Sequence, residues 1–262
     1  MDTKQSTQSY RRYRAYVGVL NTNYIHPKSP WVAAWWSAAF PGMGHLIHGA
    51  YLKGFILFGW EFIINLMSNL NLAILYSFIG EFDMAREVLD TKWFLLYAPV
   101  YIVSIWDSYR TSVDLNKLYV LAKREKAPIV PFQMGNISVN YLDKRHPWLA
   151  TWWSIMMPGL GHLYLKRVLL GFFLLIIWII MVYFSNFLPA IHYTMLGDFT
   201  QAKNVVDAQW LMFMPSIYCF AIYRSYILAV EYNRLFETEL AEFLQKNYQA
   251  STFVMPCKQE MR

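Results

Sequence analysis

Charged residues are scarce in this chain of 262 residues: they make up 15% of it, whereas a soluble domain carries about 25%. Hydrophobic residues account for 56% and aromatic residues for 18%, with 11 Trp among them. So few polar side chains cannot cover a surface that faces water on all sides. The composition therefore predicts an integral membrane protein rather than a soluble domain.

The usual signatures of enzymes are also missing. The sequence has no glycine-rich phosphate loop, no His-Glu-x-x-His, no Gly-x-Ser-x-Gly and no pair of carboxylates within an apolar segment. The two cysteines, Cys219 and Cys257, have neither metal nor disulfide spacing, so we expect disulfides to have no structural role. These absences predict a protein that is not an enzyme and that uses neither cofactor nor metal.

Two further absences concern targeting and partners. The first 30 residues are polar and basic and contain no apolar core, so we expect no cleavable signal peptide. The net charge of +6 raises the question of nucleic-acid binding, but the basic residues lie beside apolar segments. That placement favours a role in membrane orientation, and we expect no nucleic-acid partner.

What the sequence does contain is one stretch in two copies. Pro30 to His45 reads PWVAAWWSAAFPGMGH, and Pro147 to His162 reads PWLATWWSIMMPGLGH. At a constant offset of 117 residues, 34 of the 89 positions from 30 to 118 are identical to their counterparts, without a gap. This pattern indicates an internal duplication. We therefore divide the chain into a basic N-terminus (1–29), repeat 1 (30–118), a basic linker (119–146), repeat 2 (147–235) and a tail (236–262).

Each repeat begins with an apolar run that is too short to cross a membrane. The first run, 31–40, has ten residues before a Pro-Gly pair, whereas a spanning helix needs about 20. We interpret it as an interfacial or re-entrant half-helix. The residues expected to form the turn after each half-helix are Pro41, Gly42, Gly44, Pro158, Gly159 and Gly161.

The rest of each repeat predicts two membrane spans separated by a short amphipathic helix. In repeat 1 these are 54–79, 80–92 and 93–106, and in repeat 2 they are 168–187, 197–207 and 210–230. The predicted fold is thus an all-α membrane protein with two parallel, pseudo-symmetric repeats. Each repeat would contain the half-helix, two transmembrane helices and an amphipathic helix outside the cytoplasm.

Charge distinguishes two possible topologies. If the half-helices crossed the membrane, each repeat would have three spans and the basic linker would face outward. If they do not cross, the protein has four spans, and 20 of the 23 Lys and Arg residues are cytoplasmic, all but Arg86, Lys92 and Lys203. The positive-inside rule favours the second topology, with both termini on the cytoplasmic side of the cell membrane.

Several residues together resemble a known family. They are Lys28-Ser29, the apolar run, Pro-Gly-x-Gly-His-Leu, Gly54 and Trp106-Asp107, with Gly161-His162-Leu163-Tyr164-Leu165 and Gly171 in the second copy. This order resembles the TM2 domain family, whose members look like a helical hairpin with a Gly-x-x-Gly-x-His-Arg-Phe-Tyr-Leu-Gly turn and a late Asp. The likeness covers the first half of each repeat. Neither copy has the Arg-Phe pair, the late Asp is Arg224 in repeat 2, and the amphipathic helix is an addition. The resemblance implies an architecture and no activity.

His45, His162 and Glu61 are the candidates for a binding site or an ion path. Each histidine follows a turn, and parallel repeats can bring the two together to bind an ion, relay protons or ligate a metal. The alternative is that each imidazole bonds a backbone carbonyl freed by its own turn. Glu61 lies within a predicted span where its counterpart is Trp178, so function and structural pairing both remain open.

Two other sets have specific expected roles. Asp107 and Arg224 are counterparts with opposite charge, which suggests a salt bridge between the repeats; the alternative pairs Asp107 with Arg110. The tryptophans of the half-helices are expected to anchor them at the membrane interface, with an aromatic ligand box as the alternative. These residues are Trp31, Trp35, Trp36, Trp148, Trp152 and Trp153.

For function, the sequence favours a non-catalytic membrane protein that binds lipid or a partner protein, a second copy of itself included. The alternative is a small channel or transporter with His45, His162 and Glu61 along a path between the repeats. A transporter requires a polar cavity that reaches the middle of the membrane with Glu61 on its wall, whereas a scaffold requires a dry interface. A metal-dependent enzyme would require a metal ion at His45 and His162.

Overall fold

The computed structural model describes residues 13–18, 20–134 and 139–249, and it is mostly helical, at 73%. The helices of the first half are α1 (Pro30–Ala39), α2 (Met43–His48), α3 (Tyr51–Ser68), α4 (Leu70–Phe78), α5 (Phe82–Val88) and α6 (Thr91–Arg124). Those of the second half are α7 (Pro147–Met156), α8 (Leu160–Tyr164), α9 (Val168–Phe184), α10 (Phe187–Met195), α11 (Phe199–Val205), α12 (Ala208–Leu211) and α13 (Met214–Asn247). The two lists follow the same order, with α12 as an additional short helix before the last one.

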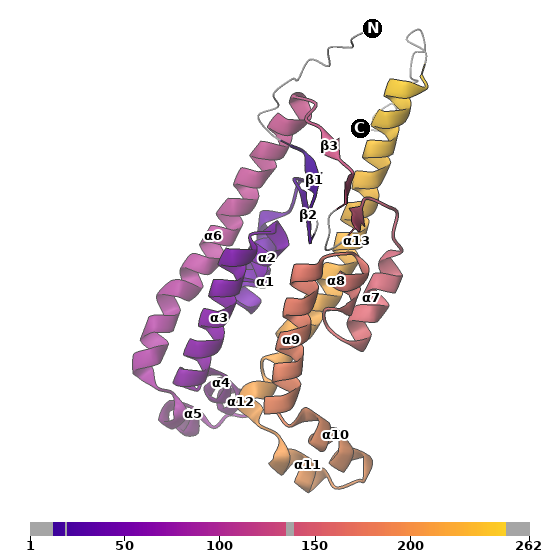
Figure 1. The fold of residues 1–262 in the computed structure, drawn as a ribbon. Coiled ribbons are helices and arrows are strands. Elements are labelled where there is room, and N and C mark those ends of the chain that lie inside the picture. The colour runs from indigo at the N-terminus through magenta and orange to yellow at the C-terminus, as the bar shows by residue number, and fades with distance from the viewer. Residues whose placement is uncertain (1–12, 19, 135–138, 250–262) are drawn as a thin grey trace, which may run out of the picture.

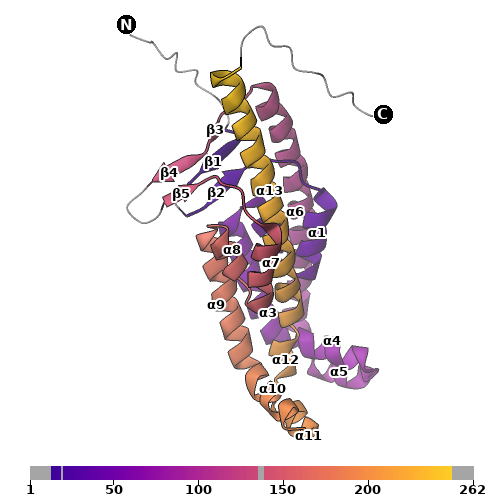
Figure 2. The ribbon, with the colours of Figure 1, turned by 90° about the vertical axis from the view of Figure 1, so that its right-hand side faces the viewer.

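Two long helices define the shape of the molecule. Both α6 and α13 rise in the same direction, from the end that carries α5 and α12 to the end that carries the strands (Figures 1 and 2). Between them, α3 and α9 run the opposite way, and α4, α5, α10 and α11 gather at the lower end of Figure 1. The long helices therefore share one orientation in the two halves.

In each half a sharp bend follows the helix that begins the expected first span. Asn69 and Asn186 adopt positive φ angles of 54° and 53°, and the chain bends by 66° between α3 and α4 and by 58° between α9 and α10. The predicted span 54–79 therefore contains two helices, and the predicted span 168–187 ends at the second bend. Asparagine tolerates the left-handed conformation better than most residues, because its short side chain can hydrogen-bond nearby backbone. Here Asn69 donates to the carbonyl of Val88 and Asn186 to that of Val205.

By length and hydropathy, the stretch Ala208–Asn247, which contains α12 and α13, is the one helix in the described ranges that can cross a membrane by itself. Three bent pairs reach the required length and hydropathy when each is taken as one span: α3 with α4, α5 with α6, and α9 with α10.

The half-helices lie along the long helices rather than across them. Beside α6, Lys28 is bonded to Asn116, Ser108 donates to the carbonyl of Ala33, and Tyr101 donates to the carbonyl of Ala38. As the residue number increases along α1, the residue number of its partners on α6 decreases, so the two helices are antiparallel neighbours. In the second half α7 lies against α13 in the same way, with Tyr218 donating to the carbonyl of Ile155 at 2.8 Å.

The segments predicted as a basic N-terminus and a basic linker contain strands, which the all-α prediction did not include. Strands β1 (Ala15–Val17) and β2 (Thr22–Tyr24) pair with each other, and β1 also pairs with β3 (Ile129–Val130). Strands β4 (Phe132–Met134) and β5 (Val139–Tyr141) form a hairpin. Ala15, Val17 and Leu142 pack with Leu228 and other residues of α13, so these strands cover the upper part of that helix.

Helix α6 also extends beyond its predicted end. It continues through Arg124, so the first six residues of the predicted linker are helical. The tail begins as part of α13 and stays helical to Asn247, while residues 250–262, with Cys257, lie outside the described part of the chain.

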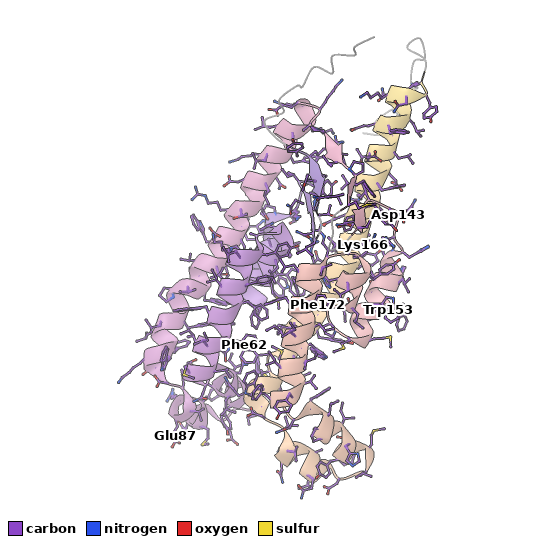
Figure 3. All side chains as sticks on the ribbon, viewed as in Figure 1. Phe62, Glu87, Asp143, Trp153, Lys166 and Phe172 are labelled. Carbon is purple, nitrogen blue, oxygen red and sulfur yellow. The ribbon has the colours of Figure 1, made fainter. Side chains whose placement is uncertain are left out.

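The main core joins the two halves. Phe40, Met43, Leu46 and Phe58 from the first half are buried together with residues of the second half. The latter are Leu170, Leu174, Met181, Phe213, Met214, Ile217, Phe220 and Ala221. Phe62, labelled in Figure 3, also reaches across, and its ring centroid lies 4.6 Å from that of Phe213. The interface between the halves is therefore apolar and closely packed.

Candidate functional site

Both Pro-Gly-x-Gly turns reverse the chain after the half-helix. Gly42 and Gly159 have φ angles of 96° and 101°, a region in which a side chain is strained. Gly44 and Gly161 then pass so close to the half-helix that an added Cβ would overlap a backbone oxygen, of Ala33 and of Ala150 respectively. The glycines thus allow α2 and α8 to fold back directly against α1 and α7.

The turn in the first half buries His45 against α6. Its Nε2 lies 2.7 Å from Oδ2 of Asp107, and since a carboxylate only accepts, Nε2 carries the hydrogen. Lys53 contacts the same carboxylate oxygen. The sequence-based alternative, a bond to a backbone carbonyl in its own turn, is not what the structure contains.

His162 has the same position in the second half and different surroundings. It is fully buried, and neither ring nitrogen has a hydrogen-bond partner within the described residues. The counterpart of Asp107 is Arg224, which offers no acceptor. Burial, with the charges of Arg224 and Arg167 nearby, lowers the pKa of His162 to about 3, so the ring is neutral.

The structure does not join the two histidines into one site. Within the described ranges, no hydrogen bond, ion pair or ring contact connects His45 to His162, and no group of three His, Cys, Asp or Glu side chains has metal-binding geometry. The juxtaposed histidine pair is therefore not present, because each ring lies within its own half.

The predicted salt bridge between Asp107 and Arg224 is wrong. Asp107 pairs with His45 and Lys53, whereas Arg224 pairs with Glu231 at 3.0 Å and donates to the carbonyl of Ile47. The alternative partner of Asp107 is wrong too, since Arg110 lies near Asp114. Each charge has other partners nearby: Asp107 meets the turn of its own half, whereas Arg224 meets Glu231 of its own helix and α2 of the first half.

Glu61 belongs to a buried polar network on α3. It accepts a hydrogen bond from Asn65, which also donates to Asn71, and both asparagines bond to Gln209 of the second half. The side chain of Gln209 also accepts from the backbone of Leu72. This network links the bend after α3 to the start of α12. Glu61 therefore takes part in hydrogen bonds that join structural elements.

The tryptophans of the half-helices divide into two groups. Trp31, Trp35, Trp148 and Trp152 are each more than 60% exposed, as the anchor prediction requires. Trp36 differs, because its ring packs against Phe220 and Tyr223 of α13 at 5.2 Å. Its counterpart Trp153 is 41% exposed.

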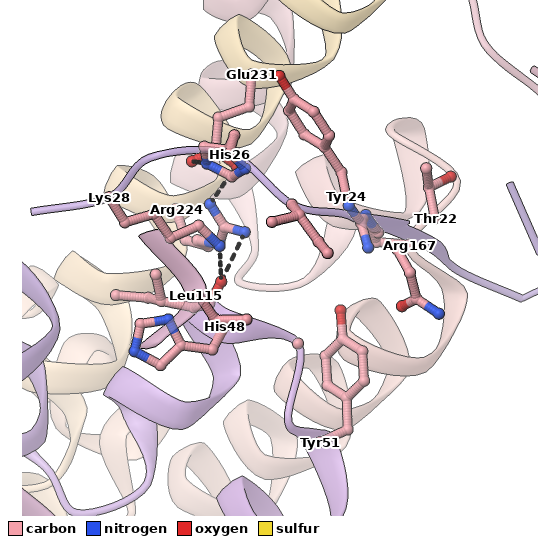
Figure 4. A pocket seen from close by; sticks show the side chains of 14 residues that line it. Thr22, Tyr24, His26, Lys28, His48, Tyr51, Leu115, Arg167, Arg224 and Glu231 are labelled. Atoms are coloured by element: carbon pink, nitrogen blue, oxygen red, sulfur yellow. Dashed lines mark hydrogen bonds and ion pairs between the residues drawn. The ribbon is translucent and has the colours of Figure 1, made fainter. Parts of the chain in front are cut away.

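A basic cavity that the sequence did not reveal lies at the upper end of the interface between the halves (Figure 4). It has a volume of about 170 Å³ and is lined by β2, the chain before α1, the end of α2, Arg167 and α13. Its charged and titratable lining residues are Tyr24, His26, Lys28, His48, Tyr51, Arg167, Arg224 and Glu231.

Hydrogen bonds hold the three cations in place. Lys28 and Arg224 both donate to the carbonyl oxygen of Ile47, which lies in the last turn of α2. Figure 4 shows the two bonds converging on this oxygen. Arg167 donates to the side chain of Asn21, and its guanidinium lies 5.1 Å from the ring centroid of Tyr232. His26 contacts Glu231 at 2.6 Å.

Positive charge is in excess in this cavity. Three cations, Lys28, Arg167 and Arg224, face one carboxylate, Glu231. Burial, reinforced by the charge of Arg224, lowers the pKa of Lys28 to about 7. The cavity thus disfavours the charged form of Lys28, as expected where like charges are buried together without enough acceptors.

Apart from Arg224, which differs in charge from its counterpart Asp107, the cavity residues were missed because the candidate residues were chosen mainly from what the two copies share. The counterparts of Arg167, Arg224 and His48 are Ala50, Asp107 and Leu165, and the counterpart of His26 is Asp143. A comparison of the copies for positions that differ in charge would have selected these residues.

Comparisons with models of protein families, with curated proteins and with solved structures find no match to this chain. The resemblance to the TM2 domain family in the turn of each copy therefore stays a prediction.

Proposed function

We propose that this chain is a non-catalytic, multi-pass membrane protein built from two parallel repeats, which binds lipid or a partner protein in the membrane. Four spans, containing α3, α6, α9 and α13, cross it, and the half-helices enter from the cytoplasmic side and return. Both termini and the linker are cytoplasmic.

Apolar surface supports the membrane part of the proposal. Large apolar side chains that are at least half exposed occupy the outer faces of α3, α6 and α9, among them Ile56, Ile63, Leu95, Leu96, Ile102, Phe172, Ile176 and Ile179. A soluble monomer rarely exposes such a patch, whereas lipid is its natural environment.

The position of the half-helices supports the re-entrant form. Since α1 runs antiparallel to α6 from Asn116 to Tyr101, it descends beside the apolar part of that helix instead of lying flat at the interface. Non-helical backbone at such depth is tolerated where protein buries it. Pro41 and Gly42 meet this condition, since both are buried.

The single observation that favours a binding role over transport is the apolar packing in the centre of the interface, between the Gln209 network and the basic cavity. Apolar residues of both halves fill this part, and His45, His162 and Glu61 line none of five cavities in the described part of the chain. A path for ions needs polar, hydrated walls, and these residues do not supply one.

Flux through proteoliposomes tests this choice. Wild-type protein is compared with His45→Ala, His162→Ala and Glu61→Gln for protons, monovalent cations and small anions, with an ionophore as the positive control. We expect wild-type vesicles to leak no faster than empty ones. A wild-type flux that falls in Glu61→Gln would contradict the proposal and assign a transport function.

A further inference from the structure

The basic cavity has buried donors without acceptors. Arg167 and Arg224 are 7% and 5% exposed, and the Nε atom of each is buried without a hydrogen-bond partner among the described residues. Buried arginine donors are almost always satisfied, because an unpaired one costs its full desolvation energy. Among the described residues, the Nε donors of Arg167 and Arg224 therefore lack a negatively charged acceptor.

The donor set fits a phosphate group. A guanidinium presents a planar fork that matches phosphate oxygens, and an ammonium adds a point charge. Two guanidinium groups and Lys28 line one cavity of about 170 Å³, several times the ~30 Å³ that a water molecule occupies in the liquid. Tyr24 lines the same cavity and carries a hydroxyl group that can donate as well, whereas the hydroxyl group of Tyr51 donates to Oδ1 of Asn21.

An apolar groove continues from this cavity toward the outer surface. A neighbouring cavity of about 250 Å³ shares Lys28 and Arg224 with the first and adds Val32, Tyr223 and Ile227. Val32 and Tyr223 in turn line a third cavity of about 680 Å³, whose other residues are Trp31, Ala34, Trp35, Trp36, Ala38 and Ile105. Along the groove between α1 and α13, the basic lining of the first cavity is thus followed by the apolar lining of the third.

We propose that the basic cavity binds the phosphate of an anionic phospholipid, with an acyl chain in the groove of Trp31 and Trp35. The inference rests on the proposed membrane function and specifies its ligand. A free phosphate ion would use the same cations, but the adjoining apolar groove favours the lipid. Arg167 and Arg224 hold the phosphate oxygens, Lys28 neutralises charge, and Glu231 keeps Arg224 in place.

Within the described ranges, the charged lining of this cavity has no equivalent in the other half, although the backbone around it occurs twice. Arg145 and Asn233 repeat the bonds between Lys28 and Asn116, so the backbone around the site has a counterpart. Arg167 and Arg224 correspond to Ala50 and Asp107. The proposal therefore predicts one bound lipid per chain.

Lipid retention tests the proposal. The protein is purified from membranes in mild detergent, and the bound phospholipids are extracted and quantified by mass spectrometry for the wild type, Arg167→Ala and Lys28→Gln. Arg110→Ala is the matched control, because Arg110 is an exposed cation on α6 with 64% of its side chain accessible. We expect about one anionic phospholipid per chain, at least about a tenfold loss in the two cavity variants, and no change in Arg110→Ala.

Three results would overturn the inference: no enrichment of anionic over zwitterionic phospholipid, equal retention in the cavity variants, or displacement of the lipid by millimolar inorganic phosphate. Trp35→Ala gives an independent measure, since it shortens the groove and leaves the cations intact; it should weaken retention with an unchanged melting temperature. Extraction of the same membranes at alkaline pH separates the two proposals. Protein that stays in the membrane without the lipid refutes this inference alone, whereas protein released from the membrane refutes the proposed function.

Discussion

Single glycines decide how closely each half-helix can pack against the turn that follows it. At Gly44 and Gly161 the backbone lies against a carbonyl oxygen of the half-helix and against a serine hydroxyl, of Ser37 and Ser154. The same contact occurs in both halves, and both serines are completely buried. Any side chain at the glycine would separate the two segments.

Alanine at these positions should therefore destabilise the protein. We expect Gly44→Ala to lower the free energy of unfolding by about 1–3 kcal/mol, the usual cost of overpacking. Gly59→Ala is the matched control, because Gly59 lies in α3 with no heavy atom within 4 Å of an added Cβ. The measurement is the denaturation midpoint in detergent. Equal midpoints for the two variants would show that α2 does not lie against α1.

His162 should make the protein sensitive to acid. Its pKa is lowered from 6.5 to about 3 in the folded chain, so the unfolded chain takes up a proton first as the pH falls. Stability is then complete above about pH 6.5 and decreases toward pH 3, because the unfolded state binds more protons in this range.

His162→Leu should reduce this dependence, since the ring nitrogens have no partner to lose among the described residues. The check is the melting temperature in detergent between pH 7 and pH 4, where each kcal/mol lost corresponds to about 2–4 °C for chains of roughly this size. The same slope in the variant and the wild type would refute the role of His162.

At this scale the sequence could identify the turns but not their partners. The Pro-Gly-x-Gly-His copies correctly located both reversals of the chain, because proline and glycine act locally. The partner of His45 and the environment of Arg224 depend on which helix packs nearby, and that information is not local. The counterparts Asp107 and Arg224 suggested a bridge, yet His45 and Glu231 lie closer to them.

At the scale of elements, one asparagine of a long helix holds the backbone just before each half-helix. Oδ1 of Asn116 accepts from the backbone N–H of Lys28, and its Nδ2 donates to the Lys28 carbonyl. Asn233 makes the same two bonds with Arg145. Each pair of bonds joins a long helix to the residue two positions before the proline of a half-helix.

Removing one of these side chains should loosen the half-helix without unfolding the chain. Asn116→Ala leaves two backbone groups unpaired at a cost of about 1–3 kcal/mol each, so hydrogen exchange should accelerate in 28–35. Asn247→Ala is the control, because Asn247 bonds only within its own helix, to the carbonyl of Phe243. Exchange that rises equally throughout the protein would indicate global destabilisation and would contradict the local role.

The helices themselves were predictable where periodicity is strong, and less so at breaks. The short helices α5 and α11 occur where the amphipathic pattern placed them. The bends at Asn69 and Asn186 were missed, since apolar residues continue on both sides and hydropathy does not register a left-handed residue. The strands were missed because β1 and β3 are 112 residues or more apart in the chain and have only two or three residues each.

At the scale of the whole molecule, two similar halves face each other across an apolar interface and differ mainly at its upper end. Charged side chains lie at both ends, with Glu87 at the lower end and Asp143 and Lys166 toward the upper end of Figure 3. In the proposed topology the first end lies outside the cytoplasm and the second inside. The chain would then cross the membrane four times, with the half-helices returning to their own side.

Labelling of single cysteines with a membrane-impermeant thiol reagent tests this claim most directly. In a background of Cys219→Ser and Cys257→Ser, cysteines are introduced at four exposed positions: Lys123, Ala241, Glu87 and Lys203. We expect the variants at Lys123 and Ala241 to react only from the cytoplasmic face and those at Glu87 and Lys203 only from the opposite face. Reaction of Lys123→Cys and Ala241→Cys from opposite faces would mean that the half-helices cross, and reaction of all four from one face would contradict the membrane topology.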